Sequence, residues 1–233
     1  MRRRPMGNSD SNMIHIEGLI KTYGLNPVLK GVNLHVQAGE FVGLVGANGA
    51  GKSTLLKIIA TLLKPTEGVI RIGGWPLPDQ ADRVRPHLGY VSHDLLLYPD
   101  LTADENLRFY GRLYGLVHID ERIAAALKQV GLYSRRHDLL RTFSRGMGQR
   151  LALARATLHG PDILLLDEPY TGLDTQGADL LDEWLIREKG RGRTILLITH
   201  DIHRGLPLCD HVLHLQRGKI QPTPDQTTLN STE

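Results

Sequence analysis

The chain has 233 residues, and 28 Lys and Arg against 25 Asp and Glu give it a formal net charge of +3. This length allows one large domain or a core with a subdomain. The small charge excess is a weak argument for a nucleic-acid partner, so none is expected. The single cysteine, Cys209, excludes an internal disulfide, and no apolar run approaches the roughly 18 residues that a membrane span requires.

The two ends of the chain are polar. Residues 1–12 begin with Met1 and three arginines, and the apolar segment of a secretory signal does not follow them. We expect a disordered, solvated tail there, and contact of the arginines with acidic lipid or nucleic acid is the alternative. Residues 221–233 are rich in Pro, Thr, Gln and Ser and are also predicted to be a polar tail, which leaves 13–220 as the folded domain.

Short apolar strands and turns are predicted in the first part of this domain. Residues 13–45 alternate such strands with turns, and Phe41–Val45 is typical of a short buried strand. Lys52–Leu63 is predicted to be a helix, which the following Lys64-Pro65 ends. Val69–Ile72, followed by two glycines, indicates a further strand and turn.

Between residues 100 and 160 the sequence pattern predicts helices in place of strands. A capping-box sequence that begins at Thr102 opens the first of them. The predicted helices run from Thr102 to about Tyr114, from Glu121 to Val130, and from Leu151 to Leu158. Ile163–Leu166 and Thr194–Thr199 are then continuous apolar runs, as in parallel strands buried on both faces. The pattern predicts an α/β core with a helical insertion near residues 90–155.

One glycine-rich segment carries the clearest chemical signal. It fits the phosphate-loop pattern G-x-x-x-x-G-K-[ST] and lies between a predicted strand and a predicted helix, as that loop requires. Glycines let backbone N–H groups surround phosphates, Lys52 is suited to the β- and γ-phosphates, and the Ser53 hydroxyl is suited to Mg²⁺. A chance glycine loop is the alternative. The predicted binding residues are Gly46, Ala47, Asn48, Gly49, Ala50, Gly51, Lys52, Ser53 and Thr54.

Two acidic residues follow the apolar run that begins at Ile163. Asp167 is expected at the carboxyl end of a buried strand, beside the phosphate loop, where it would organise Mg²⁺. Glu168 faces a different direction and is expected to polarise the attacking water. The alternative is that both merely cap the next helix, and Pro169 directly after them disfavours it.

Two further polar positions are candidates for the same site. His200 follows the apolar run 194–199 and is expected to contact the γ-phosphate and link it to Glu168; a surface histidine at a strand end is the alternative. Ser144 and Gly146 lie in a turn that leads into a helix and offers a hydroxyl and free N–H groups to an anion. An ordinary helix cap is the alternative there.

These segments, in this order and spacing, resemble the ATP-binding subunit of ABC transporters. The resemblance covers about residues 13–220 and assigns a family role to each segment. Gly46–Thr54 matches the Walker A loop, Phe143–Gln149 the family signature, Ile163–Glu168 Walker B with its catalytic glutamate, Leu173-Asp174 the D-loop, His200 the switch histidine, and Tyr23 the aromatic residue that stacks on adenine.

The resemblance implies a fold and a mode of action. The implied fold is a P-loop NTPase core with a mainly parallel sheet, an N-terminal antiparallel β subdomain and a helical subdomain at about 93–155. The implied ligands are ATP and Mg²⁺. A head-to-tail dimer, expected to be a homodimer, would hold each ATP between one subunit's Walker A loop and the other's Ser144 and Gly146. The chain would lie at the cytoplasmic face of the cell membrane and dock on a permease through residues 93–115.

Two departures from the family pattern bear on the site. His93 stands where the family has a glutamine; it is expected to bond water or metal-bound groups, and a plain loop residue is the alternative. The signature reads Ser-Arg-Gly-Met, with Arg145 and Met147 in place of Gly and Gln.

The departures point to one subfamily. The chain looks most like the ATP-binding subunit of the haem exporter of cytochrome c-type biogenesis. This likeness rests on Tyr90–His93, Leu97-Tyr98, Leu101-Thr102, Glu105–Leu107, Phe109–Tyr114 and the signature. Three alternatives remain: a multidrug or polysaccharide exporter, a soluble ABC ATPase that acts on ribosomes or DNA, and a nucleotide sensor without turnover.

Overall fold

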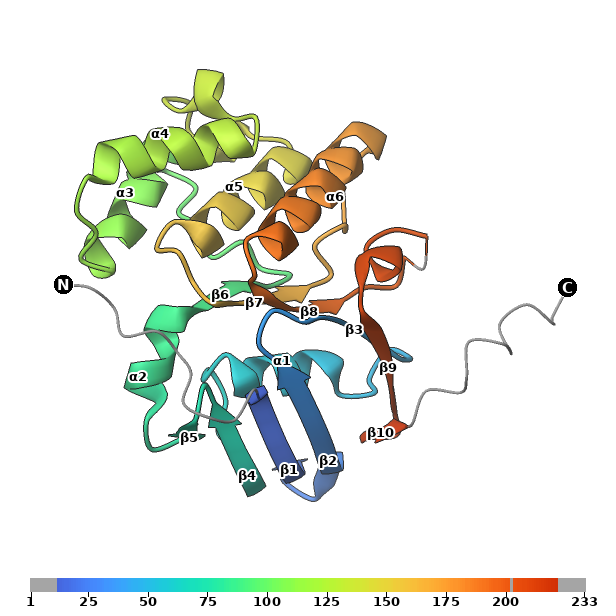
Figure 1. The fold of residues 1–233 in the computed structure, drawn as a ribbon. Coiled ribbons are helices and arrows are strands. Elements are labelled where there is room, and N and C mark those ends of the chain that lie inside the picture. Colours follow the sequence, from blue (N-terminus) through green and yellow to red (C-terminus); the bar gives the residue numbers. More distant parts are fainter. Residues whose placement is uncertain (1–11, 202, 222–233) are drawn as a thin grey trace, which may run out of the picture.

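The computed structural model describes residues 12–201 and 203–221. The first strand begins at Asn12 and the last ends at Gln221, so each of these two residues is in a strand although it falls inside a predicted tail. The remainder of both predicted tails lies outside the described residues. Figure 1 shows two sheets with one helix between them and further helices above the larger sheet.

The smaller sheet is antiparallel and has the strand order β2-β1-β4-β5. Its two long strands, β1 and β2, run over 12 residues each and are thus longer than the short strands predicted there, whereas the short strand predicted at Phe41–Val45 is confirmed. The tight turn at Gly24, whose φ is 58°, joins them as a hairpin. The four strands are Asn12–Tyr23, Asn26–Gln37, Glu67–Ile72 and Trp75–Leu77.

The larger sheet has the order β10-β9-β3-β8-β7-β6 and is parallel except for β10, which pairs antiparallel with β9. Because β3, β8 and β7 are neighbours and parallel, their carboxyl ends meet at one edge. The strands are β3 Phe41–Val45, β6 Leu88–Val91, β7 Ile163–Asp167, β8 Thr194–Ile198, β9 His211–Gln216 and β10 Lys219–Gln221.

Helix α1, Lys52–Ile59, lies between the two sheets (Figure 1). The prediction that this helix continues to Leu63 is wrong. The chain turns at Thr61, whose φ is 62°, and the N–H groups of Leu62 and Leu63 both donate to the carbonyl of Lys57. This closure satisfies the last helical carbonyls before Lys64-Pro65 is reached.

Helices α3, α4, α5 and α6 cover the opposite face of the larger sheet, whereas Val84 of α2 packs in the core on the α1 side. The predicted capping box is confirmed at α3: Glu105 N donates to Thr102 Oγ1 at 3.2 Å, and Thr102 N donates to Glu105 Oε2 at 2.8 Å. Helix α5 begins six residues earlier than predicted because Ser144 caps it. The helices are α3 Ala103–Leu113, α4 Ile119–Gln129, α5 Arg145–Thr157 and α6 Thr175–Gly190; α2 is Ala81–Val84, and short 3-10 helices are Arg85–His87, Tyr133–Arg135, Leu140–Thr142 and Leu206–Leu208.

The larger sheet separates two apolar cores. In β7, Ile163 and Leu165 pack toward α1 and the smaller sheet, whereas Leu164 and Leu166 pack toward the helices on the other face. Strand β8 alternates in the same way, and every residue of both strands is buried. The prediction of parallel strands buried on both faces is therefore confirmed, as is the α/β fold class with its antiparallel sheet and inserted helices.

Candidate nucleotide-binding and hydrolysis site

The glycine-rich loop runs from the end of β3 to the start of α1. Its backbone is in the left-handed region at Gly46 and Gly51, with φ of 153° and 106°. A Cβ on Gly46 would lie 2.1 Å from the carbonyl oxygen of Leu215, and one on Gly51 would lie 2.7 Å from Leu29 Cδ2. Only glycine fits at these two positions, and the loop they allow leads directly into the N-terminus of α1, whose free N–H groups favour an anion.

Lys52 is buried within this loop and is only 6% exposed. Its ammonium donates to the carbonyl oxygens of Gly46 at 2.6 Å and Ala47 at 3.1 Å. These bonds hold a positive charge over the loop, in the position where a phosphate chain would need a cation. Gly46 and Ala47 thus accept hydrogen bonds from Lys52 through their carbonyl groups, and Ala50 is buried.

Ser53 and Asp167 meet although 114 positions separate them in the chain. The Ser53 hydroxyl donates to Asp167 Oδ1 at 3.2 Å. Burial raises the pKa of Asp167, and the hydrogen bond from Ser53 opposes that rise. A hydroxyl and a carboxylate side by side are hard oxygen donors, so this pair fits Mg²⁺, which is bound through few protein ligands in phosphate sites.

Glu168 is aimed away from the line of β7 by its backbone, which has a φ of 54°. Its carboxylate oxygen Oε1 lies 3.0 Å from His200 Nε2, and Oε2 accepts from the backbone N–H of His200 at 3.2 Å. Burial raises the pKa of Glu168, and the charge of His200 opposes that rise. A left-handed non-glycine residue costs of the order of 1 kcal/mol, so packing around the strand end must hold it in place.

The phosphate loop, both acidic residues and His200 line one cavity of about 480 Å³. His93 also reaches this cavity from the loop that follows β6. Sequence reasoning missed two of its lining residues, Val28 and Ile198, because nothing in an apolar strand residue distinguishes a cavity wall from a core position. The full lining is Val28, Asn48, Gly49, Gly51, Lys52, Ser53, Thr54, His93, Asp167, Glu168, Ile198 and His200.

Tyr23 does not belong to this lining. It ends β1 with 48% of its surface exposed, and the ammonium of Lys21 lies 5.2 Å from its ring centre.

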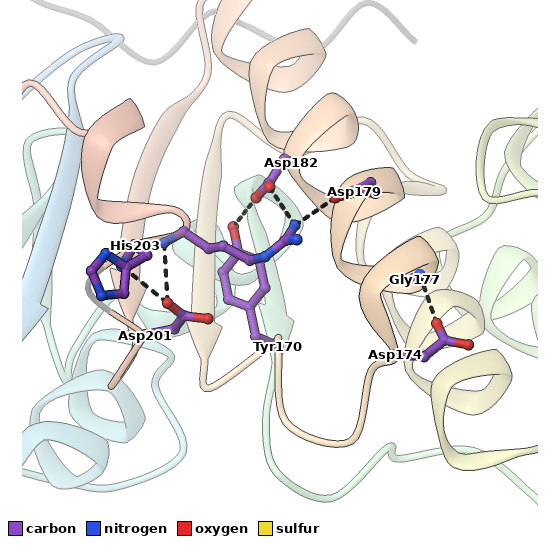
Figure 2. Close-up of polar contacts among 8 residues, drawn as sticks. Tyr170, Asp174, Gly177, Asp179, Asp182, Asp201 and His203 are labelled. Atoms are coloured by element: carbon purple, nitrogen blue, oxygen red, sulfur yellow. Dashed lines mark hydrogen bonds and ion pairs between the residues drawn. The ribbon is translucent and has the colours of Figure 1, made fainter.

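Ser144 and Gly146 are not brought to the phosphate loop of their own chain. Ser144 caps α5 by accepting a hydrogen bond from the N–H of Met147 at 3.2 Å. Both residues line a separate hollow of about 190 Å³ together with Asp174, and this hollow shares no residue with the phosphate-loop cavity. Asp174 caps α6 by accepting from the N–H of Gly177 at 2.7 Å (Figure 2).

A polar cluster that sequence reasoning missed lies beside α6. Figure 2 shows Tyr170 directed at Asp182, whose carboxylate accepts from the phenol at 2.5 Å. The guanidinium of Arg204 donates to Asp182 at 2.9 Å and to Asp179 at 2.8 Å. The only signal in the sequence was the spacing of Asp179 and Asp182, which places them on one face of a helix.

Comparison with known proteins decides the family. A sequence model described as ABC transporter matches residues 29–171. The chain belongs to the ABC transporter family. It is 35% identical to the linearmycin resistance ATP-binding protein LnrL of Bacillus subtilis (strain 168), over 94% of this chain and 71% of that protein. It is 38% identical to the Nod factor export ATP-binding protein I of Cupriavidus metallidurans, over 89% of this chain and 69% of that protein.

Solved structures of ABC proteins share the fold. A dimeric ATP-binding cassette in a post-hydrolysis state, bound to ADP and Pi, superposes with a TM-score of 0.84 at 30% identity and covers 90% of this chain and 97% of that one. The cbiO1 protein of Clostridium perfringens, part of the ABC transporter complex cbiONQ, superposes with a TM-score of 0.81 at 28% identity, over 91% and 88%. This chain is thus an ABC-type ATPase. Among its described residues, no helix is both long and apolar enough to cross a membrane.

Proposed function

We propose that this chain is the ATP-binding and hydrolysing subunit of an ABC exporter, in which binding of Mg-ATP closes a dimer and drives a separate membrane subunit. The observation that carries the proposal is the convergence of Lys52, the Ser53–Asp167 pair and the Glu168–His200 pair on one cavity. Export is favoured because relatives at 35% and 38% identity are named for linearmycin resistance and Nod factor export.

Six residues of the cavity have proposed roles. Lys52 neutralises the β- and γ-phosphates, and Ser53 with Asp167 would hold Mg²⁺, which supplies positive charge to the transferring phosphoryl group. Glu168 takes the proton of the attacking water, and His200 holds Glu168 and contacts the γ-phosphate. His93 reaches the same cavity and is proposed to bond the water or a metal-bound group.

The site is proposed to be completed by a second copy of the chain. Ser144 and Gly146 lie apart from the phosphate loop of their own subunit, so they are available to the nucleotide of another. We also propose Tyr23 as the residue that stacks on adenine, since its side chain is half-exposed at the end of β1 and the neighbouring strand β2 contributes Val28 to the cavity lining.

The membrane subunit is proposed to dock on a groove between α1, β6, α3 and α5, within and beside the predicted surface 93–115. The groove has a volume of about 210 Å³, and its lining includes Arg85 and Arg155 but no carboxylate. Arg155 is only 9% exposed; it donates to the carbonyl of Tyr90 at 2.7 Å, and its Nε has no hydrogen-bond partner among the described residues. A carboxylate on a short apolar segment of the membrane subunit would complement this buried cation.

The proposed cargo follows from the subfamily. Haem is the proposed cargo, because segments such as Tyr90–His93 resemble the haem exporter of cytochrome c-type biogenesis. A multidrug or polysaccharide exporter is the alternative, and the names of the relatives favour it.

The experiment is to tag the chain, solubilise native membranes in mild detergent and identify what co-purifies. We expect a polytopic membrane subunit to be recovered with wild type. Leu62→Asp, at a groove residue that is 62% exposed, should abolish recovery, whereas Ile186→Asp, at a position on α6 that is 55% exposed, should not. Cytochrome c maturation proteins in the eluate would identify haem as the cargo. Ribosomes or nucleic acid in place of a membrane subunit would contradict the transporter proposal.

A further inference from the structure

One carboxylate on α6 joins the two loops that follow the strands β7 and β8. Asp182 Oδ1 accepts from the hydroxyl of Tyr170 at 2.5 Å, and its Oδ2 accepts from the guanidinium of Arg204 at 2.9 Å (Figure 2). Tyr170 comes two residues after Glu168, and Arg204 comes four residues after His200. The side chain of Asp182 therefore contacts both the loop that carries Glu168 and the loop that carries His200.

The loop that carries His200 is internally braced. Asp201 Oδ1 accepts from the backbone N–H groups of His203 at 3.0 Å and Arg204 at 3.2 Å, and Asp201 N donates to Thr199 Oγ1 at 3.1 Å. These bonds join the backbone of Arg204 to Asp201, the residue that directly follows His200.

The two loops also touch directly. A Cβ on Gly205, whose φ is +63°, would lie 2.9 Å from the hydroxyl oxygen of Tyr170. Burial raises the pKa of Tyr170, which keeps its hydroxyl protonated and able to donate to Asp182 at neutral pH. The two loops are therefore packed so closely at this point that a side chain on residue 205 would collide with Tyr170.

We propose that Asp182 is a positioning residue for ATP hydrolysis: it sets the contact between Glu168 and His200 by tying their two loops together. The inference rests on the proposed roles of Glu168 and His200. Asp179 is the natural comparison, because it also accepts from Arg204, whereas the hydroxyl of Tyr170 donates to Asp182. Its side chain is 61% exposed against 28% for Asp182, as expected of a weak surface ion pair.

The experiment compares Asp182→Asn with Asp179→Asn in the full chain. Asp182→Asn keeps an oxygen that can accept from Tyr170 but places an amide NH₂ group against the guanidinium of Arg204, so the ion pair with Arg204 is lost. We expect kcat for ATP hydrolysis to fall about tenfold with KM for ATP within about twofold, because misplacement of the catalytic groups affects the chemical step. Asp179→Asn should leave both constants within about twofold of wild type.

A second comparison separates positioning from general destabilisation. A His200→Ala background lacks the imidazole that Asp182 is proposed to position and keeps only the backbone hydrogen bond to Glu168, so Asp182→Asn should change kcat there by less than about twofold. Tyr170→Phe breaks the other tie and provides the same test if Asp182→Asn does not fold. The folded fraction of each variant is measured by circular dichroism.

Two results would overturn the inference while leaving the proposed function intact. One is wild-type kcat in both Asp182→Asn and Tyr170→Phe, alongside a Glu168→Gln variant that no longer turns over. The other is an equal loss of kcat from Asp182→Asn with and without His200. Wild-type turnover in Glu168→Gln would overturn the proposed role of Glu168 and this inference with it.

Discussion

At the scale of single residues, the site depends on two adjacent carboxylates with different surroundings. Asp167 accepts from the Ser53 hydroxyl, which is a proposed Mg²⁺ ligand, and Glu168 lies against the imidazole of His200. Burial raises the pKa of both, and the charge of Asp167 adds to the rise at Glu168. Two adjacent carboxylates thus have different hydrogen-bonding partners, which suits Asp167 to its proposed role with Mg²⁺ and Glu168 to its proposed role with water.

Glu168→Gln should slow hydrolysis by about 10²–10⁴-fold and leave ATP binding intact, because only the proton acceptor is lost. A base must be ionised to act, so the wild-type rate should fall as pH is lowered through the pKa of Glu168. Since that pKa is raised, the fall begins at higher pH than for an ordinary glutamate. We would measure kcat from about pH 5 to pH 8, with Glu67→Gln as an exposed control. Near-normal turnover in Glu168→Gln would remove the assigned role.

At the scale of elements, local chemistry sets where helices begin more clearly than where they end. The capping residues Thr102, Ser144 and Asp174 each accept a backbone N–H of the first helical turn. These bonds involve residues three positions apart, and such a pattern revealed the start of α3, although the start predicted for α5 was six residues too late. The ends of α1 and α3 depend instead on how the following turn packs, and the prediction for α1 failed there.

Thr102→Ala should lower the free energy of unfolding by about 1 kcal/mol, the usual contribution of an N-cap. Hydrogen bonds from the backbone and hydroxyl of Thr102 lower the pKa of Glu105. The stability from that bond is present above the unfolded-state pKa of Glu105 and is lost as pH falls through its lower folded-state pKa.

Urea unfolding at neutral and acidic pH measures this loss. Ser134→Ala, at an exposed hydroxyl in a short 3-10 helix, is the matched control. Equal stability of the two variants at neutral pH would show that the capping box contributes nothing to folding.

At the scale of the whole molecule, the phosphate-loop residues and the Ser144–Gly146 segment of the proposed site line two separate cavities. The phosphate-loop cavity and the hollow of Ser144, Gly146 and Asp174 share no lining residue. A head-to-tail pair of chains would bring one against the other, and a similar cassette has been solved as a dimer with ADP and Pi. The prediction that follows is ATP-dependent dimerisation.

With Glu168→Gln to block turnover, Mg-ATP should convert the chain to a dimer in sedimentation or light scattering. Adding Ser144→Asp should weaken the dimer at least about tenfold, because aspartate still caps α5 but places a negative charge against phosphate. Ser134→Asp adds the same charge at an exposed position away from the hollow and should leave the dimer unchanged. Equal dimerisation with Ser144→Asp would exclude this segment from the interface.

Much of the architecture follows from short-range pattern. Continuous apolar runs predicted β7 and β8, and the capping box predicted α3, because burial on two faces and a helix start involve neighbours in sequence. The glycines around Lys52 predicted the phosphate loop for the same reason: Gly46 and Gly51 adopt backbone angles that other residues rarely take. The antiparallel hairpin was recognised only as short strands, since its length depends on pairing.

Contacts across the fold depend on strand order, which hydropathy does not encode. Ser53 lies close to Asp167, and Glu168 close to His200, because the sheet places β3, β8 and β7 side by side with their carboxyl ends at one edge. The junction at Asp182 needs a helix to bring one carboxylate within reach of two loops at once. Residue types and their spacing thus specified the chemistry of the site, whereas packing of the sheet and α6 specified which of those residues touch.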